Sequence, residues 1–184
     1  MVEFITLKNK DEVELIEGVI LYPLTVNKDD SGILVETLKT DWEGIYGQDR
    51  KFAMQYFSVT DPGVIRDEKV WHYHPNQEDR FVVAKGEIVV AIADNRNNSK
   101  TKELVNLFYM KFDKDPYNLL IPKQTLHGFM VISKEPGVLL NFPTQLYNPE
   151  EEGRIPHDEA GVKFSDGALF SWNIVRSNLQ KIND

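Results

Sequence analysis

The sequence predicts an all-β protein, a sandwich or barrel of about ten short strands with one helix near its C-terminal end. Three observations point to this fold. Short apolar runs rich in β-branched and aromatic residues recur along most of the chain. Clusters of Gly, Pro, Asn and Asp separate these runs about every 8–12 residues. Helical spacing of apolar residues is found only in the C-terminal tail.

The first half of the chain is expected to contain four strands. The apolar run 19–25 ends at the turn signals of 27–32, and residues 33–38 alternate between apolar and polar side chains. The aromatic and β-branched run 52–59 is stopped by Asp61-Pro62-Gly63. Residues 69–74 follow as a strand that carries two histidines.

The second half continues this pattern and then changes. Gly86 separates two of its strands, which are expected over 80–84, 87–93, 104–112, 118–121, 128–133 and 138–142. In residues 168–182 the apolar side chains lie close to helical spacing, which predicts an amphipathic helix packed on the barrel. No repeat, low-complexity stretch or linker divides the chain, so residues 1–184 are expected to form one domain.

Composition excludes several classes of function. The 184 residues include no cysteine, which rules out disulfides, thiol nucleophiles and thiolate metal sites. The net charge of −8 argues against binding to nucleic acid or to anionic membranes. No apolar run approaches the roughly 18 residues that span a bilayer. Residues 1–10 alternate and carry Glu3, unlike a secretory signal. A cytoplasmic location is therefore expected.

The histidines are the most informative side chains. His72 and His74 are spaced i, i+2 on an expected strand, so both point to the same face. A carboxylate, Glu78 or Asp79, precedes the next apolar run, and His127 follows an Ile-Pro pair later in the chain. Convergence of these groups inside one barrel would suit either proton transfer near neutral pH or metal binding.

Five segments resemble, in the same order, the signatures of the dTDP-4-dehydrorhamnose 3,5-epimerase family. They are 29–36 (DDSGILVE), 69–74 (KVWHYH), 86–96 (GEIVVAIADNR), 121–129 (IPKQTLHGF) and 147–150 (YNPE). The resemblance implies a cupin-type double-stranded β-helix jelly roll with a short C-terminal helix. It also implies a homodimer that binds a dTDP-4-keto-6-deoxy sugar in its barrel without a cofactor. Such enzymes are isomerases of deoxysugar biosynthesis, including dTDP-rhamnose biosynthesis.

The family chemistry implies roles for individual residues. His72 matches the family base, which removes the proton α to the C4 ketone before a tyrosine reprotonates the opposite face of the sugar. Gln55, His127 and Tyr147 match substrate contacts, and Lys69 matches an arginine beside the base. Two further cations, Arg66 and Arg80, complete a candidate cluster for the anionic diphosphate or the enolate.

Some family positions differ in this chain. Leu139, Leu140 and Asn141 occupy the region of the tyrosine acid, and Asp166 is the nearest candidate for the aspartate that orients the base. His74 replaces a family glutamine, which gives the His-x-His pattern that resembles related dTDP-4-keto sugar 3,4-ketoisomerases. In those enzymes the histidines shuttle protons on one face of the sugar. Epimerisation and ketoisomerisation by His72 and His74 therefore both stay open.

Two other functions remain in competition. His72, His74, Asp79 and His127 also resemble the ligand set of metal-dependent cupins, in which one divalent transition metal would be held by imidazoles and a carboxylate. The missing tyrosine motivates the last alternative, a barrel that binds a sugar nucleotide without turning it over.

Overall fold

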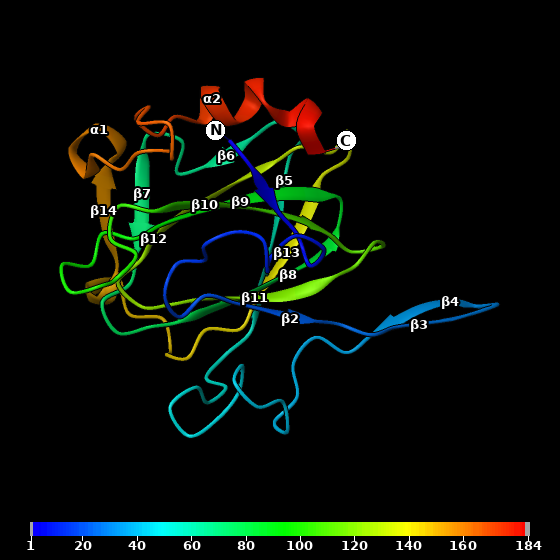
Figure 1. The fold of residues 1–184 in the computed structure, drawn as a ribbon. Helices are drawn as coiled ribbons and strands as arrows, with labels where there is room; N and C mark the ends of the chain where they lie inside the picture. Colours follow the sequence, from blue (N-terminus) through cyan, green and yellow to red (C-terminus); the bar gives the residue numbers. More distant parts are fainter. Residues whose placement is uncertain (1, 183–184) are drawn as a thin grey trace.

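The chain forms two β-sheets packed face to face, as the computed structural model shows for residues 2–182 (Figure 1). The larger sheet consists of β1 (Phe4–Ile5), β6 (Ile65–Arg66), β7 (Val70–Tyr73), β9 (Glu87–Ala93), β10 (Val105–Lys111), β12 (Leu126–Val131) and β14 (Gly153–Pro156). The smaller sheet consists of β2 (Ile20–Pro23), β5 (Tyr56–Thr60), β8 (Asp79–Lys85), β11 (Tyr117–Ile121) and β13 (Gly137–Asn141).

The strand order is that of a jelly roll. The larger sheet runs β1-β10-β9-β12-β7-β14, with β6 also paired to β12, and the smaller sheet runs β2-β11-β8-β13-β5. Strands β10 to β13 alternate between the two sheets along the chain, so most neighbours within a sheet, β9 and β10 apart, are not consecutive in sequence. The predicted all-β architecture is confirmed.

Strand β9 shows why the sequence folds this way. Its side chains Ile88, Val90 and Ile92 belong to the core between the sheets. The alternate residues Val89 and Ala91 face the other side, where the C-terminal segment covers them. Because both faces are buried, the strand is a continuous apolar run rather than an alternating one.

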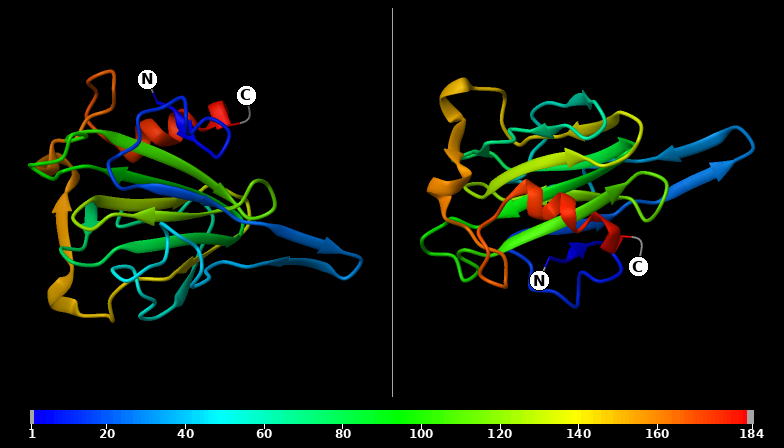
Figure 2. Two further views of the ribbon diagram at one scale, coloured as in Figure 1. Left: turned by 60° about the horizontal axis from the view of Figure 1, so that its bottom comes forward. Right: turned by 90° about the horizontal axis from the view of Figure 1, so that it is seen from above.

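The elements outside the two sheets are short. Strands β3 (Val26–Asp29) and β4 (Gly32–Val35) form a hairpin that projects away from the sheets (Figures 1 and 2). The helices are η1 (Pro149–Glu151), α1 (His157–Ala160), α2 (Trp172–Ser177) and η2 (Leu179–Ile182). Figure 2 shows α2 lying across the outer face of the larger sheet, where Trp172 and Val175 are buried. Within residues 2–182, every helix is too short to cross a membrane.

Several boundary predictions were wrong: the strand predicted over 52–59 starts only at Tyr56, and two further cases have a clear local cause. The turn predicted over 27–32 is shorter, because Asn27 to Asp29 pair with β4 and the Asp29 carboxylate accepts the N–H groups of Ser31 and Gly32. The helix predicted over 168–182 starts only after Ser171, whose side chain caps α2, and it breaks at Asn178 before η2.

Candidate active site

Three of the four histidines come together between the sheets. Strands β7 and β12 pair so that His72 lies directly opposite His127. His74 lies two residues beyond His72 and shares its face. The ring centroids are 4.6 Å apart for His72 and His74, 5.2 Å for His72 and His127, and 5.8 Å for His74 and His127. The predicted convergence is confirmed.

A buried carboxylate meets this cluster from the other sheet. Asp79 begins β8 and is 2% exposed. Its Oδ1 accepts hydrogen bonds from Gln77 Nε2 at 2.8 Å and from Asn141 Nδ2 at 2.7 Å. Its Oδ2 lies 3.5 Å from His74 Nε2 and 3.6 Å from His127 Nε2. Asp79 is therefore fixed with one oxygen directed between two imidazoles.

The hydrogen bonding of His74 fixes which of its ring nitrogens faces Asp79. His74 Nδ1 lies 3.2 Å from the Glu151 carbonyl oxygen, which can only accept, so Nδ1 carries the hydrogen. Nε2 is therefore the His74 nitrogen that faces Asp79 Oδ2, at 3.5 Å.

His72 is held in a different state. Burial lowers its pKa and the neighbouring His74 adds to this, while Glu152 and Asp67 act in the opposite direction. Its nitrogens lie 3.6 Å from Glu152 Oε1 and 4.0 Å from Asp67 Oδ2, which is beyond hydrogen-bond distance. His72 is therefore neutral near pH 7 and able to accept a proton.

A cavity of about 160 Å³ connects these groups. The larger sheet and its connections line it with Arg66, Asp67, His72, His74, His127, Gly128 and Phe129. The smaller sheet contributes Tyr56, Ser58, Asp79, Phe81 and Leu139. A ligand in this cavity would thus contact polar groups from both sheets and the apolar side chains of Phe81, Phe129 and Leu139, a mixture that is usual for small-molecule sites.

Of the predicted cationic residues, only Arg66 lines the cavity. Its Nε donates to Thr60 Oγ1 at 3.0 Å. Arg80 is fully buried, and its guanidinium donates to the main-chain carbonyls of Ile45, Arg50, Lys51 and Phe142. The prediction that it contacts substrate is wrong. Arg80 follows Asp79 in the strand, so it points to the opposite face.

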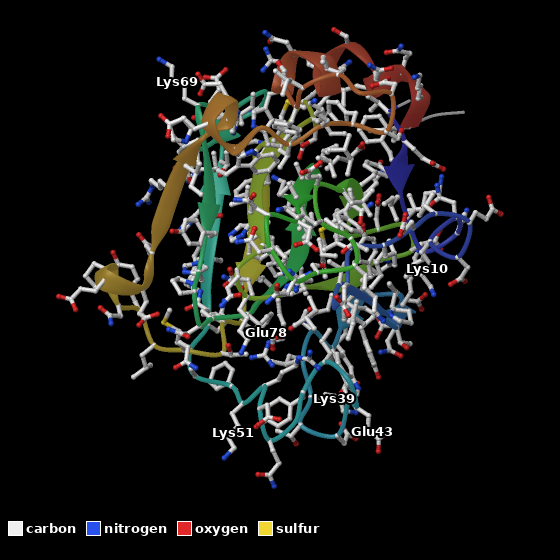
Figure 3. All side chains as sticks on the ribbon, turned by 60° about the vertical axis from the view of Figure 1, so that its left-hand side comes forward. Lys10, Lys39, Glu43, Lys51, Lys69 and Glu78 are labelled. Carbon is white, nitrogen blue, oxygen red and sulfur yellow. The ribbon has the colours of Figure 1, made fainter. Side chains whose placement is uncertain are left out.

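Lys69 also lies outside the cavity. It is exposed beside His157 and Phe170, in a separate hollow. Figure 3 shows Lys69 at the end of the molecule near α1, away from Glu78. It lies in the turn just before β7, so the predicted cluster of Arg66, Lys69 and Arg80 does not form.

The other predicted contacts are peripheral. Gln55 is exposed just before β5, and Tyr147 is exposed in the loop before η1. Asp166 accepts the N–H of Ala168 in an exposed loop and does not line the cavity. Carboxylates near His72 come instead from Asp67 and Glu152, neither of which the sequence singled out.

The cluster also offers a ligand set for a metal ion. His72, His74 and His127 each provide one nitrogen, and these nitrogens lie within 4.8 Å of one another. The nearby Asp79 Oδ2 adds a carboxylate oxygen. Imidazole with carboxylate suits zinc, iron, manganese or nickel. These four residues therefore fit a divalent transition metal in donor type.

Comparison with known proteins identifies the family. Residues 14–177 match the model of the dTDP-4-dehydrorhamnose 3,5-epimerases. The chain belongs to this family. It is accordingly an isomerase-class protein of the dTDP-sugar group, as its sequence motifs predicted.

Relatives and solved structures agree with this membership. A probable low-salt glycan biosynthesis epimerase, Agl13 of Haloferax volcanii, is 40% identical over 78% of this chain and 89% of its own. A dTDP sugar isomerase from Desulfovibrio desulfuricans has a TM-score of 0.73 at 25% identity, covering 86% of this chain and 92% of its own. The 3,5-epimerase RmlC of Legionella pneumophila, in complex with dTDP-4-keto-L-rhamnose, shares the fold. Its TM-score is 0.69 at 23% identity, over 90% of this chain and 94% of that one.

The buried His127 predicts a loss of stability in acid. Burial lowers its pKa to about 3, whereas an unfolded histidine titrates near 6.5. Between these values the unfolded chain binds one proton more, so stability falls as the pH falls below about 6.5. From pH 7 to pH 5 this one group should cost about 2 kcal/mol of unfolding free energy. The test is urea unfolding of the wild type and of His127→Gln at pH 7 and at pH 5. The unfolding free energy of the variant should fall less between the two pH values, because it lacks the contribution of His127. Equal losses in both proteins would contradict it.

Proposed function

We propose that this protein is a sugar-nucleotide epimerase or isomerase that removes a proton α to the 4-keto group of a deoxysugar. The observation that carries the proposal is that His72 lines a cavity together with His74, His127 and Asp79, where burial lowers its pKa. A carbon acid next to a ketone needs such a base. The names of the relatives, a glycan biosynthesis epimerase and a dTDP-sugar isomerase, support a role in deoxysugar biosynthesis.

The remaining groups would stabilise the enolate. When His72 takes the proton, negative charge develops on the ketone oxygen, and donors already aimed at that position lower the barrier. Arg66 lines the cavity and supplies a cationic donor for this oxygen. His127, which stays neutral, would contact the sugar ring.

The size of the cavity limits what it encloses. A volume of about 160 Å³ suits a single sugar ring, whereas pockets for drug-sized ligands usually have roughly 300–1,000 Å³. The nucleotide would therefore lie outside the cavity, where the exposed Gln55 and Tyr147 could bind it. A dTDP-4-keto-6-deoxy sugar is the substrate class that we propose, by analogy with the ligand in the Legionella enzyme.

A metal-dependent reaction is the second candidate. The favouring observation is the close approach of three imidazole nitrogens beside a carboxylate. About one transition ion per chain, in protein purified without a tag or chelator, would favour it. The third candidate, a non-catalytic sugar-nucleotide-binding barrel, would bind dTDP without turning over any keto sugar.

We also propose a homodimer, as the family resemblance implies. The projecting hairpin carries the exposed apolar side chains Ile33 and Leu34. Strand β5 is the edge of the smaller sheet and exposes Phe57 and Val59. An open edge and an apolar hairpin are both suited to pairing with a second copy. A cytoplasmic location stays a prediction from the sequence.

Replacing the base should abolish proton exchange. We expect His72→Asn to slow the exchange of the sugar proton α to the ketone with D₂O by about 100-fold or more. Proton NMR of a dTDP-4-keto-6-deoxy sugar measures the loss of that signal. The matched control is His157→Asn, a histidine outside the cavity, which should keep the wild-type rate. Undiminished exchange by His72→Asn would sink the assignment.

The dimer proposal predicts that a single charged substitution in the hairpin weakens association. Burying a charge at Leu34 should disfavour association, so Leu34→Asp should sediment as a monomer at concentrations where the wild type is a dimer. Leu146→Asp changes a similarly exposed leucine outside the hairpin and should leave the dimer intact. Sedimentation velocity distinguishes the species. A monomeric wild type, or a dimeric Leu34→Asp protein, would contradict the proposal.

A further inference from the structure

Tyr56 lies on the opposite side of the cavity from His72. It is the first residue of β5, at the edge of the smaller sheet, and its side chain lines the cavity. His72 reaches the same cavity from β7 of the larger sheet. Because the sheets face each other, a ring held between them would present one face to the imidazole and the other to the phenol.

The hydrogen bonds of Asn141 orient the phenol. β13 pairs with β5 so that Asn141 lies directly opposite Tyr56. Its Nδ2 donates to the Tyr56 hydroxyl at 2.9 Å and to Asp79 Oδ1 at 2.7 Å. Since the hydroxyl oxygen accepts this bond, its own hydrogen is available to donate toward the cavity. One amide thereby links the phenol to the carboxylate that fixes the histidines.

The electrostatics keep this phenol protonated. Burial raises the pKa of Tyr56, and the negative charge of Asp79 raises it further. Asn141 acts in the opposite direction, because its N–H stabilises the phenolate. Tyr56 is therefore protonated near neutral pH. When it gives up that proton, the Asn141 N–H is already placed to donate to the phenolate oxygen.

We propose that Tyr56 is the acid that protonates the sugar carbon on the face opposite His72. This inference rests on the proposed function, because it needs a carbanion to protonate. His72 takes the proton from carbon and the electron pair moves to the ketone oxygen. The Tyr56 O–H then gives its proton to that carbon and the ketone re-forms. Solvent reprotonates the phenolate and takes the proton from His72, so the configuration inverts with no net change of atoms.

If Tyr56 is the acid, replacing it should affect the rate of α-proton exchange and the rate of inversion differently. In D₂O, Tyr56→Phe should still exchange the α proton within a few-fold of the wild-type rate, because His72 can return a deuteron to the same face. Formation of the inverted sugar should fall by about 100-fold or more. Proton NMR follows both events in one sample. Tyr22→Phe, a tyrosine of β2 that stacks on Trp42 and does not line the cavity, is the matched control and should keep both rates.

Each other outcome overturns the assignment in a distinct way. Undiminished inversion by Tyr56→Phe removes Tyr56 as the acid and leaves the proposed function standing. An equal loss of exchange and inversion would assign Tyr56 to substrate binding instead. A wild type that exchanges protons but only shifts the ketone, without inversion, needs no acid on that face. A wild type that exchanges nothing removes the proposed function and Tyr56 with it.

Discussion

The buried carboxylate of Asp79 is the constraint on which the site depends. A charge that is 2% exposed is costly unless donors surround it. Gln77 and Asn141 donate to one of its oxygens, and the imidazoles of His74 and His127 flank the other. These partners come from strands of both sheets and from the connection before β8. The carboxylate therefore joins the two sheets at the cavity that it lines.

This arrangement divides chemical roles between the sheets. The larger sheet carries His72, which burial keeps neutral, while the smaller sheet carries Tyr56, whose proton burial retains. The cavity of about 160 Å³ thus has an unprotonated base on one side and a protonated acid on the other. His74 lines the same cavity, and its Nε2 lies 3.5 Å from Asp79 Oδ2. Inversion by two side chains needs one group that accepts a proton and one that donates a proton at the same pH, so the two groups must have different pKa values.

Local sequence pattern was enough to predict the strands and the histidine cluster, but not the rest of the site. The i, i+2 spacing of His72 and His74 fixes a common face, and their meeting with His127 follows from the fold class. The same alternation places Arg80 on the strand face opposite Asp79, and Lys69 lies in the turn before β7, so neither lines the cavity. Tyr56 and Glu152 could not be found this way, because their positions depend on the pairing of β5 with β13 and of β14 with β7. Such pairings join segments far apart in the chain.

The central claim is that this cavity moves protons through its own side chains. The most direct test is the rate of solvent-deuterium exchange into a dTDP-4-keto-6-deoxy sugar, measured on wild-type protein before and after dialysis against a chelator. Proton chemistry by His72 predicts exchange next to the ketone at the same rate in both samples. Loss of exchange after chelation, with recovery on adding a divalent transition ion, would contradict the claim and make the histidine cluster a metal centre.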